Sequence, residues 1–240
     1  MSIQLWGRLW QGRSPLGDTH QRSRQIIRST GGIMRGKFPS LKNGRVVHHE
    51  GLLELDAIYL FELNPSIQRY REQPARVFFS DGQCQRRYTP DFELTLTTGE
   101  LIWIEVKPLR FLREQETSTR LGHVVAHMSA AGRRFEVLAD DVLRLEPRQS
   151  TARTIWRRLP RVLPSQVCCA VAIARHQASF PMTLDAAQAV MVAEQADVYT
   201  AMLYGLLTMD FSLSLRGETL IQLREEGDHD WFCISQTRDF

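Results

Sequence analysis

The residues of this 240-residue chain that could do chemistry together are two acids and a lysine, Asp91, Glu105 and Lys107. They fall in two β-like runs, 87–96 and 101–108, which turn-like residues separate. Side chains alternate between the two faces of a strand, so the apolar residues of both runs predict one shared face and the three charged residues the other. We expect Asp91 to lie opposite Lys107, with Glu105 as a diagonal neighbour within side-chain reach.

Two carboxylates and an ammonium in one patch suit the hydrolysis of a phosphodiester. Carboxylate oxygens are the ligands that Mg²⁺ prefers, and a bound ion keeps positions for water and a phosphate oxygen. The ion lowers the pKa of its water and neutralises developing charge, while a lysine orients or deprotonates that water. The pattern therefore predicts a Mg²⁺ site at which Mn²⁺ substitutes. A surface ladder of ion pairs is the alternative interpretation of the same three residues.

A further carboxylate, Glu54, lies in a helical pattern over 49–63 that is apolar nearly all round and that Asn64-Pro65 stops. A partly buried carboxylate needs a cation or hydrogen-bond donors. A metal ion held by Asp91 and Glu105 would supply the cation. The predicted catalytic set is therefore Glu54, Asp91, Glu105 and Lys107, of which the three acids are the metal ligands.

The elements around this set predict a mixed α/β fold. Helix 49–63 precedes β-like runs at 66–72 and 76–79, and a long helix over 111–131 precedes a strand at 135–138. A sheet rich in hairpins with a helix crossing back over it gives a mixed sheet flanked by helices.

The composition after residue 146 predicts a second, smaller domain. We expect a basic N-terminal arm and a catalytic domain over 1–145, a linker rich in Pro, Arg and Ser over 146–160, and a small domain over 161–240. Two short helices and a hairpin in the last part are typical of a winged helix. The second of these helices is poor in Arg and Lys, which favours docking to a protein over reading DNA.

Positive charge is unevenly spread, although the net charge is only +3. Residues 1–49 hold nine Lys or Arg against one acid, Asp18, and 148–161 hold five Arg without an acid. Such stretches suit a phosphate backbone, and a solvated arm is the other interpretation. The predicted DNA contacts are Arg35, Lys37, Lys42, Arg45 and His48.

Localisation follows from what the sequence lacks. Its four cysteines follow no CxxC spacing, which argues against a zinc site or a disulfide framework. No apolar run approaches the roughly 20 residues that span a bilayer. We therefore expect a cytoplasmic protein with no membrane partner.

Several motifs together resemble one family. The run GKFPSLKNGRVVHHEGLLELDAIYLFELNPSIQRYREQP, followed by RRYTPDFEL and IEVKP, resembles the TnsA family, the endonuclease subunits of heteromeric transposons in the PD-(D/E)xK superfamily. The close resemblance covers roughly residues 35–110. It is carried by the combination of motifs, which is far more specific than the catalytic pattern alone.

The resemblance implies a restriction-endonuclease-like fold and a role in bacterial DNA transposition. It implies cutting of the 5′ strands at transposon ends beside a DDE-type transposase, and an AAA+ ATPase regulator that contacts the C-terminal domain. By motif match, Glu54 is the helix carboxylate, Asp91 the central metal ligand and Lys107 the catalytic lysine. Glu105 stands where some members have Gln, and Gln73 also fits the family pattern, in a structural role.

Two other functions remain open. One is a free-standing restriction or junction-resolving nuclease of the same fold, which would cut without a partner. The other is a non-catalytic DNA-binding adaptor, against which the intact set of Glu54, Asp91, Glu105 and Lys107 speaks.

Overall fold

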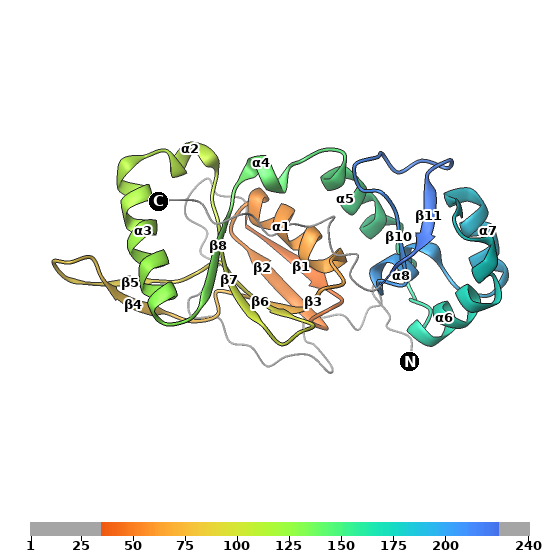
Figure 1. Cartoon of the computed structure of the whole chain (residues 1–240), viewed down its shortest axis with the longest axis horizontal. Coiled ribbons are helices and arrows are strands. Elements are labelled where there is room, and N and C mark those ends of the chain that lie inside the picture. The colour runs from red at the N-terminus through yellow and green to blue at the C-terminus, as the bar shows by residue number, and fades with distance from the viewer. Residues whose placement is uncertain (1–34, 226–240) are drawn as a thin grey trace. The chain divides into compact units, whose positions relative to one another are not determined.

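The computed structural model describes residues 35–225, which form two compact units. The larger unit contains 35–61 and 66–144, and the smaller contains 62–65 and 145–225. Figure 1 shows the elements of both. The basic stretch before residue 35 lies outside the described residues. Within 35–225, no helix is long and apolar enough to cross a membrane.

A four-stranded mixed sheet forms the centre of the larger unit. Its order is β3-β6-β7-β8, and the strands are Ile67–Glu72, Phe92–Leu96, Leu101–Val106 and Arg134–Leu138. β3, β6 and β7 pair antiparallel, whereas β7 and β8 pair parallel. A parallel pair needs a crossover, which α2 (Leu109–Leu112) and α3 (Gln115–Ala130) supply. The predicted mixed sheet flanked by helices is confirmed.

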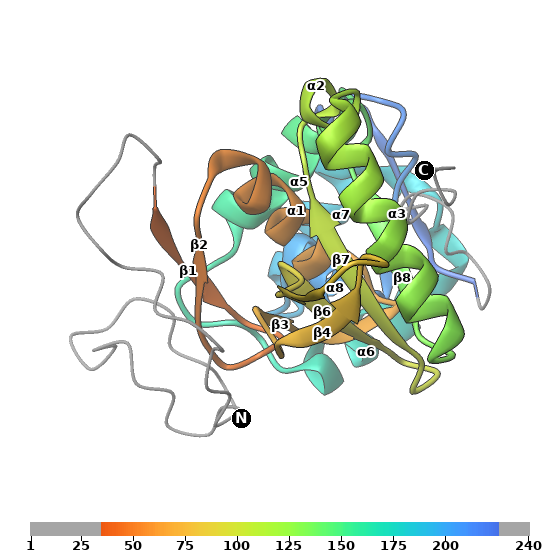
Figure 2. The ribbon, with the colours of Figure 1, turned by 90° about the vertical axis from the view of Figure 1, so that its left-hand side faces the viewer.

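Helices cover both faces of this sheet, as Figure 2 shows for α1 and α3 on either side of β7. α1 (Leu52–Leu63) places Phe61 against Tyr70 and Phe92, with ring centroids 5.6 and 5.4 Å apart. On the other face, Trp103 belongs to a buried cluster with residues of β8 and α3. Burial on both faces makes the central strands almost continuously apolar. This rigid layer fixes whatever stands at the ends of the strands.

Two hairpins differ from the sequence-based expectation. β1 (Gly36–Ser40) and β2 (Arg45–His49) form an antiparallel pair where an arm and the start of a helix were predicted. The helix prediction was wrong at this end because residues 45–49 alternate between buried and half-buried positions, which is the period of a strand. α1 therefore begins at Leu52, and His48 lies on a strand.

The second hairpin divides the run that was predicted to be one strand over 87–96. β4 (Val77–Ser80) pairs with β5 (Gln85–Tyr88) in a separate two-stranded sheet, and β6 begins only at Phe92. Pro90 lies in the break. A proline has no N–H to donate to a ladder, so the strand ends there.

The register of β6 and β7 also differs from the prediction. Phe92 lies opposite Ile104 and Leu94 opposite Ile102, so the next position along brings Asp91 to Glu105 rather than to Lys107. Gly99, with a φ of 86°, forms a tighter turn between β6 and β7 than the predicted pairing of Asp91 with Lys107 requires. The shift is two residues, and an even shift leaves the side chains of β6 and β7 on their predicted faces.

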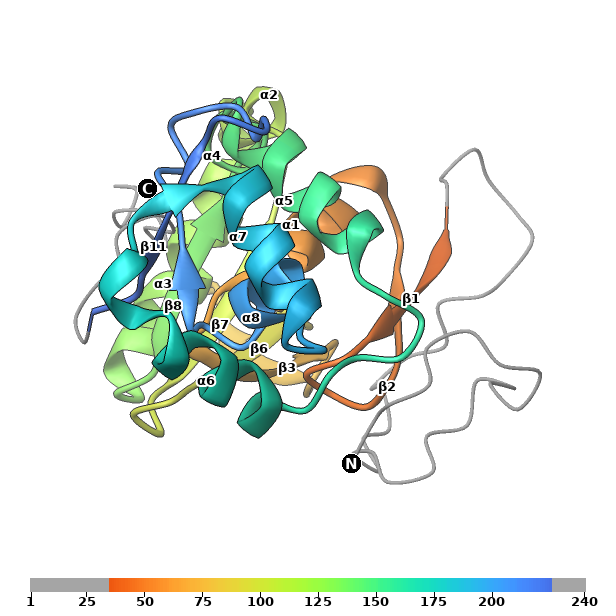
Figure 3. The same cartoon turned by 90° about the vertical axis from the view of Figure 1, so that its right-hand side faces the viewer.

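The smaller unit combines helices with a three-stranded antiparallel sheet of order β10-β11-β9. Its helices can be followed in Figure 3. They are α5 (Arg148–Arg158), α6 (Gln166–Arg175), η1 (Gln177–Ser179), α7 (Leu184–Ala193) and α8 (Val198–Leu203). The strands are β9 (Met182–Thr183), β10 (Leu207–Thr208) and β11 (Leu220–Leu223). The short α4 (Asp140–Leu143) belongs to the larger unit.

The predicted linker over 146–160 is wrong. Those residues contain α5, in which Thr151, Ala152 and Ile155 are buried. The apolar and small residues are spaced along one helical face, so the stretch packs into the smaller unit despite its arginines.

A buried ion pair joins the β1–β2 hairpin to the sheet. The Arg45 guanidinium places its two terminal nitrogens 3.0 and 2.7 Å from the two carboxylate oxygens of Glu72 on β3. Both residues are less than a tenth exposed. Removing one partner of such a pair leaves the other charge buried without compensation.

We therefore predict that Arg45→Ala lowers the free energy of unfolding by about 3–5 kcal/mol. Urea unfolding followed by circular dichroism measures it. Lys37→Ala is the matched control, because Lys37 is exposed on the same hairpin and a surface change of this kind stays within about 0.5 kcal/mol. Equal losses in the two variants would contradict the structural role of Arg45.

Candidate active site

Asp91 joins three strands at one end of the sheet. Its backbone carbonyl accepts a hydrogen bond from the N–H of Gln73, just beyond β3, at 2.8 Å. Its carboxylate oxygen Oδ2 accepts one from the N–H of Val106, the last residue of β7, also at 2.8 Å. Pro90 ends the regular backbone pairing. The Asp91 carboxylate therefore accepts the hydrogen bond from the Val106 N–H that a backbone carbonyl would accept in a continuous ladder. The carboxylate is thereby fixed in position and direction.

Gln73 holds this arrangement from the side of β3. It is buried and adopts a φ of 46°, in the left-handed region that few residues other than glycine occupy. That turn of the backbone directs its N–H to Asp91. The geometry agrees with the structural role expected for Gln73.

Glu105 and Lys107 lie at the end of β7. Lys107 Nζ is 3.3 Å from Glu105 Oε1, and the Lys107 N–H donates to the carbonyl of Leu138, extending the ladder with β8 beyond its last paired residues. The Glu105 side chain is 6% exposed and that of Lys107 is 26% exposed. The ammonium therefore reaches solvent, where a substrate would arrive, while the carboxylate beneath it stays buried.

Glu54 completes the set from the first turn of α1. Its oxygen Oε2 accepts a hydrogen bond from the N–H of Glu50 at 2.8 Å, and the side chain is half-buried. Burial, then the charge of Glu105, then the charge of Glu54 raise the pKa of Asp91 well above its ordinary value, against the Val106 N–H and Lys107. The structure therefore brings together all four residues predicted from the sequence.

Three carboxylates against one ammonium leave this site with an excess of negative charge. The repulsion is offset by a divalent cation in many proteins with such a cluster. Glu105 supports this fit, because its oxygen Oε2 is buried and has no hydrogen-bond partner among the described residues. An oxygen of this kind is suited to a metal ion.

The acids do not form a closed cage. Within 35–225, no three His, Cys, Asp or Glu side chains stand close enough to enclose an ion by themselves. An ion held here by Asp91 and Glu105 would keep water among its ligands, as Mg²⁺ commonly does in proteins.

Tyr88, which falls in the run 87–96 that was predicted to be one strand, lies beside this site but was not in the predicted catalytic set. Burial raises the pKa of its phenol well above the ordinary value, and the nearby charges of Glu105 and Asp91 raise it further. One uninterrupted strand would have put Tyr88 on the apolar face with Phe92. The break at Pro90 interrupts this alternation of side chains between the two faces. Pro90 was the residue in the sequence that indicated such a break.

The five predicted DNA contacts do not form one exposed surface. Arg45 is buried against Glu72, and Lys42 donates to the carbonyl of Ile67 at 2.6 Å. Arg35 lies 3.8 Å from Glu50, and His48 is half-buried opposite the exposed Lys37. We do not include Arg45 in a DNA-binding surface, because its guanidinium is occupied within the fold.

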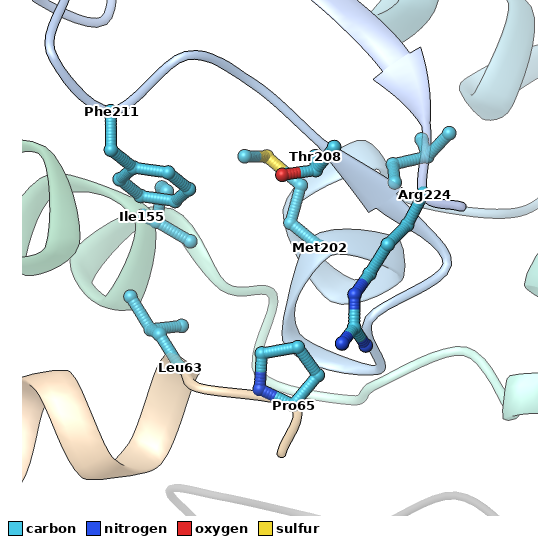
Figure 4. A pocket seen from close by; sticks show the side chains of 8 residues that line it. Leu63, Pro65, Ile155, Met202, Thr208, Phe211 and Arg224 are labelled. Carbon is cyan, nitrogen blue, oxygen red and sulfur yellow. The ribbon is translucent and has the colours of Figure 1, made fainter. Parts of the chain in front are cut away.

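A small pocket lies in the smaller unit, apart from these acids. Figure 4 shows it lined mainly by apolar side chains, among them Leu63, Ile155, Met202 and Phe211. Thr208 and Arg224 are its polar members, and no carboxylate lines it. It carries none of the chemistry of the acidic cluster.

No protein-family model matches this chain, and no curated protein matches it significantly. Its function is therefore inferred from the residues and geometry of the site.

We predict that the isolated chain binds Mn²⁺ and that Asp91→Asn weakens the affinity at least about tenfold, because the substitution removes a charged ligand. Calorimetric titration measures it, with Glu100→Gln as control, since Glu100 is exposed at the opposite end of the β6–β7 hairpin. Asn keeps an acceptor for the Val106 N–H and removes one repelling charge. The variant is therefore expected to be no less stable than wild type without metal. Unchanged Mn²⁺ affinity in Asp91→Asn would rule out Asp91 as a ligand.

Proposed function

We propose that this chain is a Mg²⁺-dependent DNA endonuclease. The observation that carries the proposal is the meeting of Glu54, Asp91, Glu105 and Lys107 at one end of the central sheet. We further propose that the larger unit has the restriction-endonuclease-like fold. A mixed sheet with α1 on one face and α3 on the other supports this assignment.

The residues divide the work of hydrolysing a phosphodiester. Asp91 and Glu105 would hold Mg²⁺, with Glu54 adding negative charge from α1. The bound ion supplies an activated water and neutralises charge that develops on the phosphate. Lys107 stands beside Glu105, which holds its ammonium nearby, where the lysine would orient or deprotonate the attacking water or stabilise a phosphate oxygen.

The resemblance of the motifs to the TnsA family makes the ends of a transposon the proposed substrate. In this proposal the chain cuts the 5′ strands in the bacterial cytoplasm, at the nucleoid, while a DDE-type transposase cuts and joins the 3′ strands. The substrate and the partner rest on this resemblance of motifs alone.

The smaller unit is proposed to be a winged-helix-like docking domain for an AAA+ ATPase regulator. Three helices, α6 to α8, with a small antiparallel sheet support that fold. All six residues of α8 are buried and none is basic. A helix that reads DNA must expose polar side chains to base edges, so this composition favours a protein partner.

The proposal is tested by cleavage of a labelled duplex that carries a transposon end, in Mg²⁺ and with the DDE-type transposase of the same element. Wild type is expected to cut the 5′ strand. Lys107→Ala is expected to slow cleavage at least about a hundredfold, because positioned proton transfer contributes about 10²–10⁴. Asp91→Asn should abolish cleavage, and Glu100→Gln, which changes an exposed side chain at the opposite end of the β6–β7 hairpin, should leave it unchanged.

The outcomes separate the alternative functions. Cutting by the isolated chain, without the transposase, would indicate a free-standing nuclease of the same fold. Wild-type rates in Lys107→Ala and Asp91→Asn would contradict the proposed site. No metal-dependent cleavage under any of these conditions would indicate a DNA-binding adaptor.

A further inference from the structure

The β4–β5 hairpin is a two-stranded ribbon separate from the central sheet. Figure 1 shows it extending outward past α3. Its inner face is part of the core, where Val77, Phe79 and Tyr88 pack in the cluster that includes residues of α3. The ribbon is therefore anchored along one face, and its other face is left for solvent or a partner.

The outer face carries an aromatic ring beside a guanidinium. Phe78 is 55% exposed and lies directly opposite Arg87 across the ribbon. Arg87 is also exposed, and it forms no ion pair with another described residue. A single exposed apolar side chain is ordinary on a protein surface, so the feature that distinguishes this face is the pairing of Phe78 with an exposed arginine directly opposite.

The tip of the ribbon is fixed by Asp81. Its carboxylate accepts hydrogen bonds from the N–H groups of Gln83 and Cys84 at 2.9 and 2.8 Å, and from Arg86 at 2.6 Å. The Cys84 N–H, then Arg86, then the Gln83 N–H lower the pKa of Asp81 well below its ordinary value. The only acid of the ribbon is thus engaged in the turn, so the turn is preorganised and Arg87 faces no acid of its own strand pair.

The charge of the surface favours a polyanion. Residues 76–88 hold three arginines, Arg76, Arg86 and Arg87, against Asp81. Arg120 of α3 adds a further positive charge near the ribbon, because its charge lowers the pKa of Tyr88. An arginine pairs with phosphate, and an aromatic side chain in the major groove of duplex DNA makes apolar contact with base edges such as the thymine methyl group.

The position of the ribbon fits the cleavage site. Arg87 precedes Asp91 by four residues, so the two lie within about 14 Å along the chain. The width of a two-stranded ribbon also matches the major groove of DNA.

We infer that the β4–β5 ribbon grips duplex DNA beside the phosphate that is cut. Arg87 neutralises a backbone phosphate, and Phe78 packs against the bases or sugars next to it. This inference rests on the proposed endonuclease function and names the element that holds its substrate, a role that no predicted DNA contact from the sequence fills.

Fluorescence anisotropy of a labelled mixed-sequence duplex tests it, with the full chain in Ca²⁺ buffer over a range of salt concentrations. Arg87→Ala should make the slope of log affinity against log salt shallower by about 0.9, the value for one lost phosphate contact. Phe78→Ala should weaken binding about fivefold or more at every salt concentration, with the slope unchanged, because an apolar contact is not ionic.

Matched controls separate these effects from general changes in charge or surface. Arg216→Ala removes an exposed arginine of the smaller unit. Leu101→Ala removes an apolar side chain that is 47% exposed at the start of β7. Both should bind DNA as wild type does, and all four variants should keep the wild-type melting temperature, since each truncates an exposed side chain.

The outcomes distinguish this inference from the proposed function. Wild-type affinity and slope in Phe78→Ala and Arg87→Ala would overturn the ribbon contact and leave the endonuclease proposal standing. Absence of DNA binding by the wild type would also overturn it, and calorimetric Mn²⁺ binding by the same sample would show whether the metal site stands. Weakened binding in the two ribbon variants with unchanged Mn²⁺ affinity supports the inference.

Discussion

The two hydrogen bonds of Asp91 are the interaction on which the rest of the site depends. Its carbonyl is bound by Gln73 after β3, and its carboxylate is bound by Val106 at the end of β7. These bonds hold together three strands at the point where Pro90 interrupts regular pairing. The same contacts hold the Asp91 carboxylate near enough to Glu105 for the charge of Glu105 to raise its pKa, so the interaction that closes the sheet also builds the acidic cluster.

This cluster costs stability, and in the proposed function it is the cluster that binds the metal ion. Burial and two neighbouring carboxylates raise the pKa of Asp91, which means that its charged form is disfavoured in the folded chain. A sheet selected for stability alone would not gather three acids around one ammonium. Perturbed acids of this kind are concentrated at functional sites. Metal binding would relieve the repulsion and couple the occupancy of the site to the stability of the larger unit.

Local patterns predicted which four residues lie together better than they predicted the register that brings them together. The alternation of Phe92, Leu94, Ile102 and Ile104 gave the correct faces of the β6–β7 hairpin, because burial enforces a period of two. The register was missed because it depends on the backbone of the turn at Gly99. Tyr88 and Arg45 were misplaced for a related reason. Whether a tyrosine faces a site or an arginine faces solvent depends on strands that are distant in sequence, such as β3 with its Glu72.

Anomalous diffraction from a crystal of the chain grown with Mn²⁺ shows whether Asp91 and Glu105 hold a metal ion. We predict a Mn²⁺ peak about 2.1 Å from carboxylate oxygens of both residues, with water completing the coordination. The orphaned oxygen of Glu105 is expected to be one of the ligands. The absence of a peak at these two side chains in a crystal saturated with Mn²⁺ would contradict this prediction. So would a structure in which Lys107 has moved away from Glu105 and pairs with another residue.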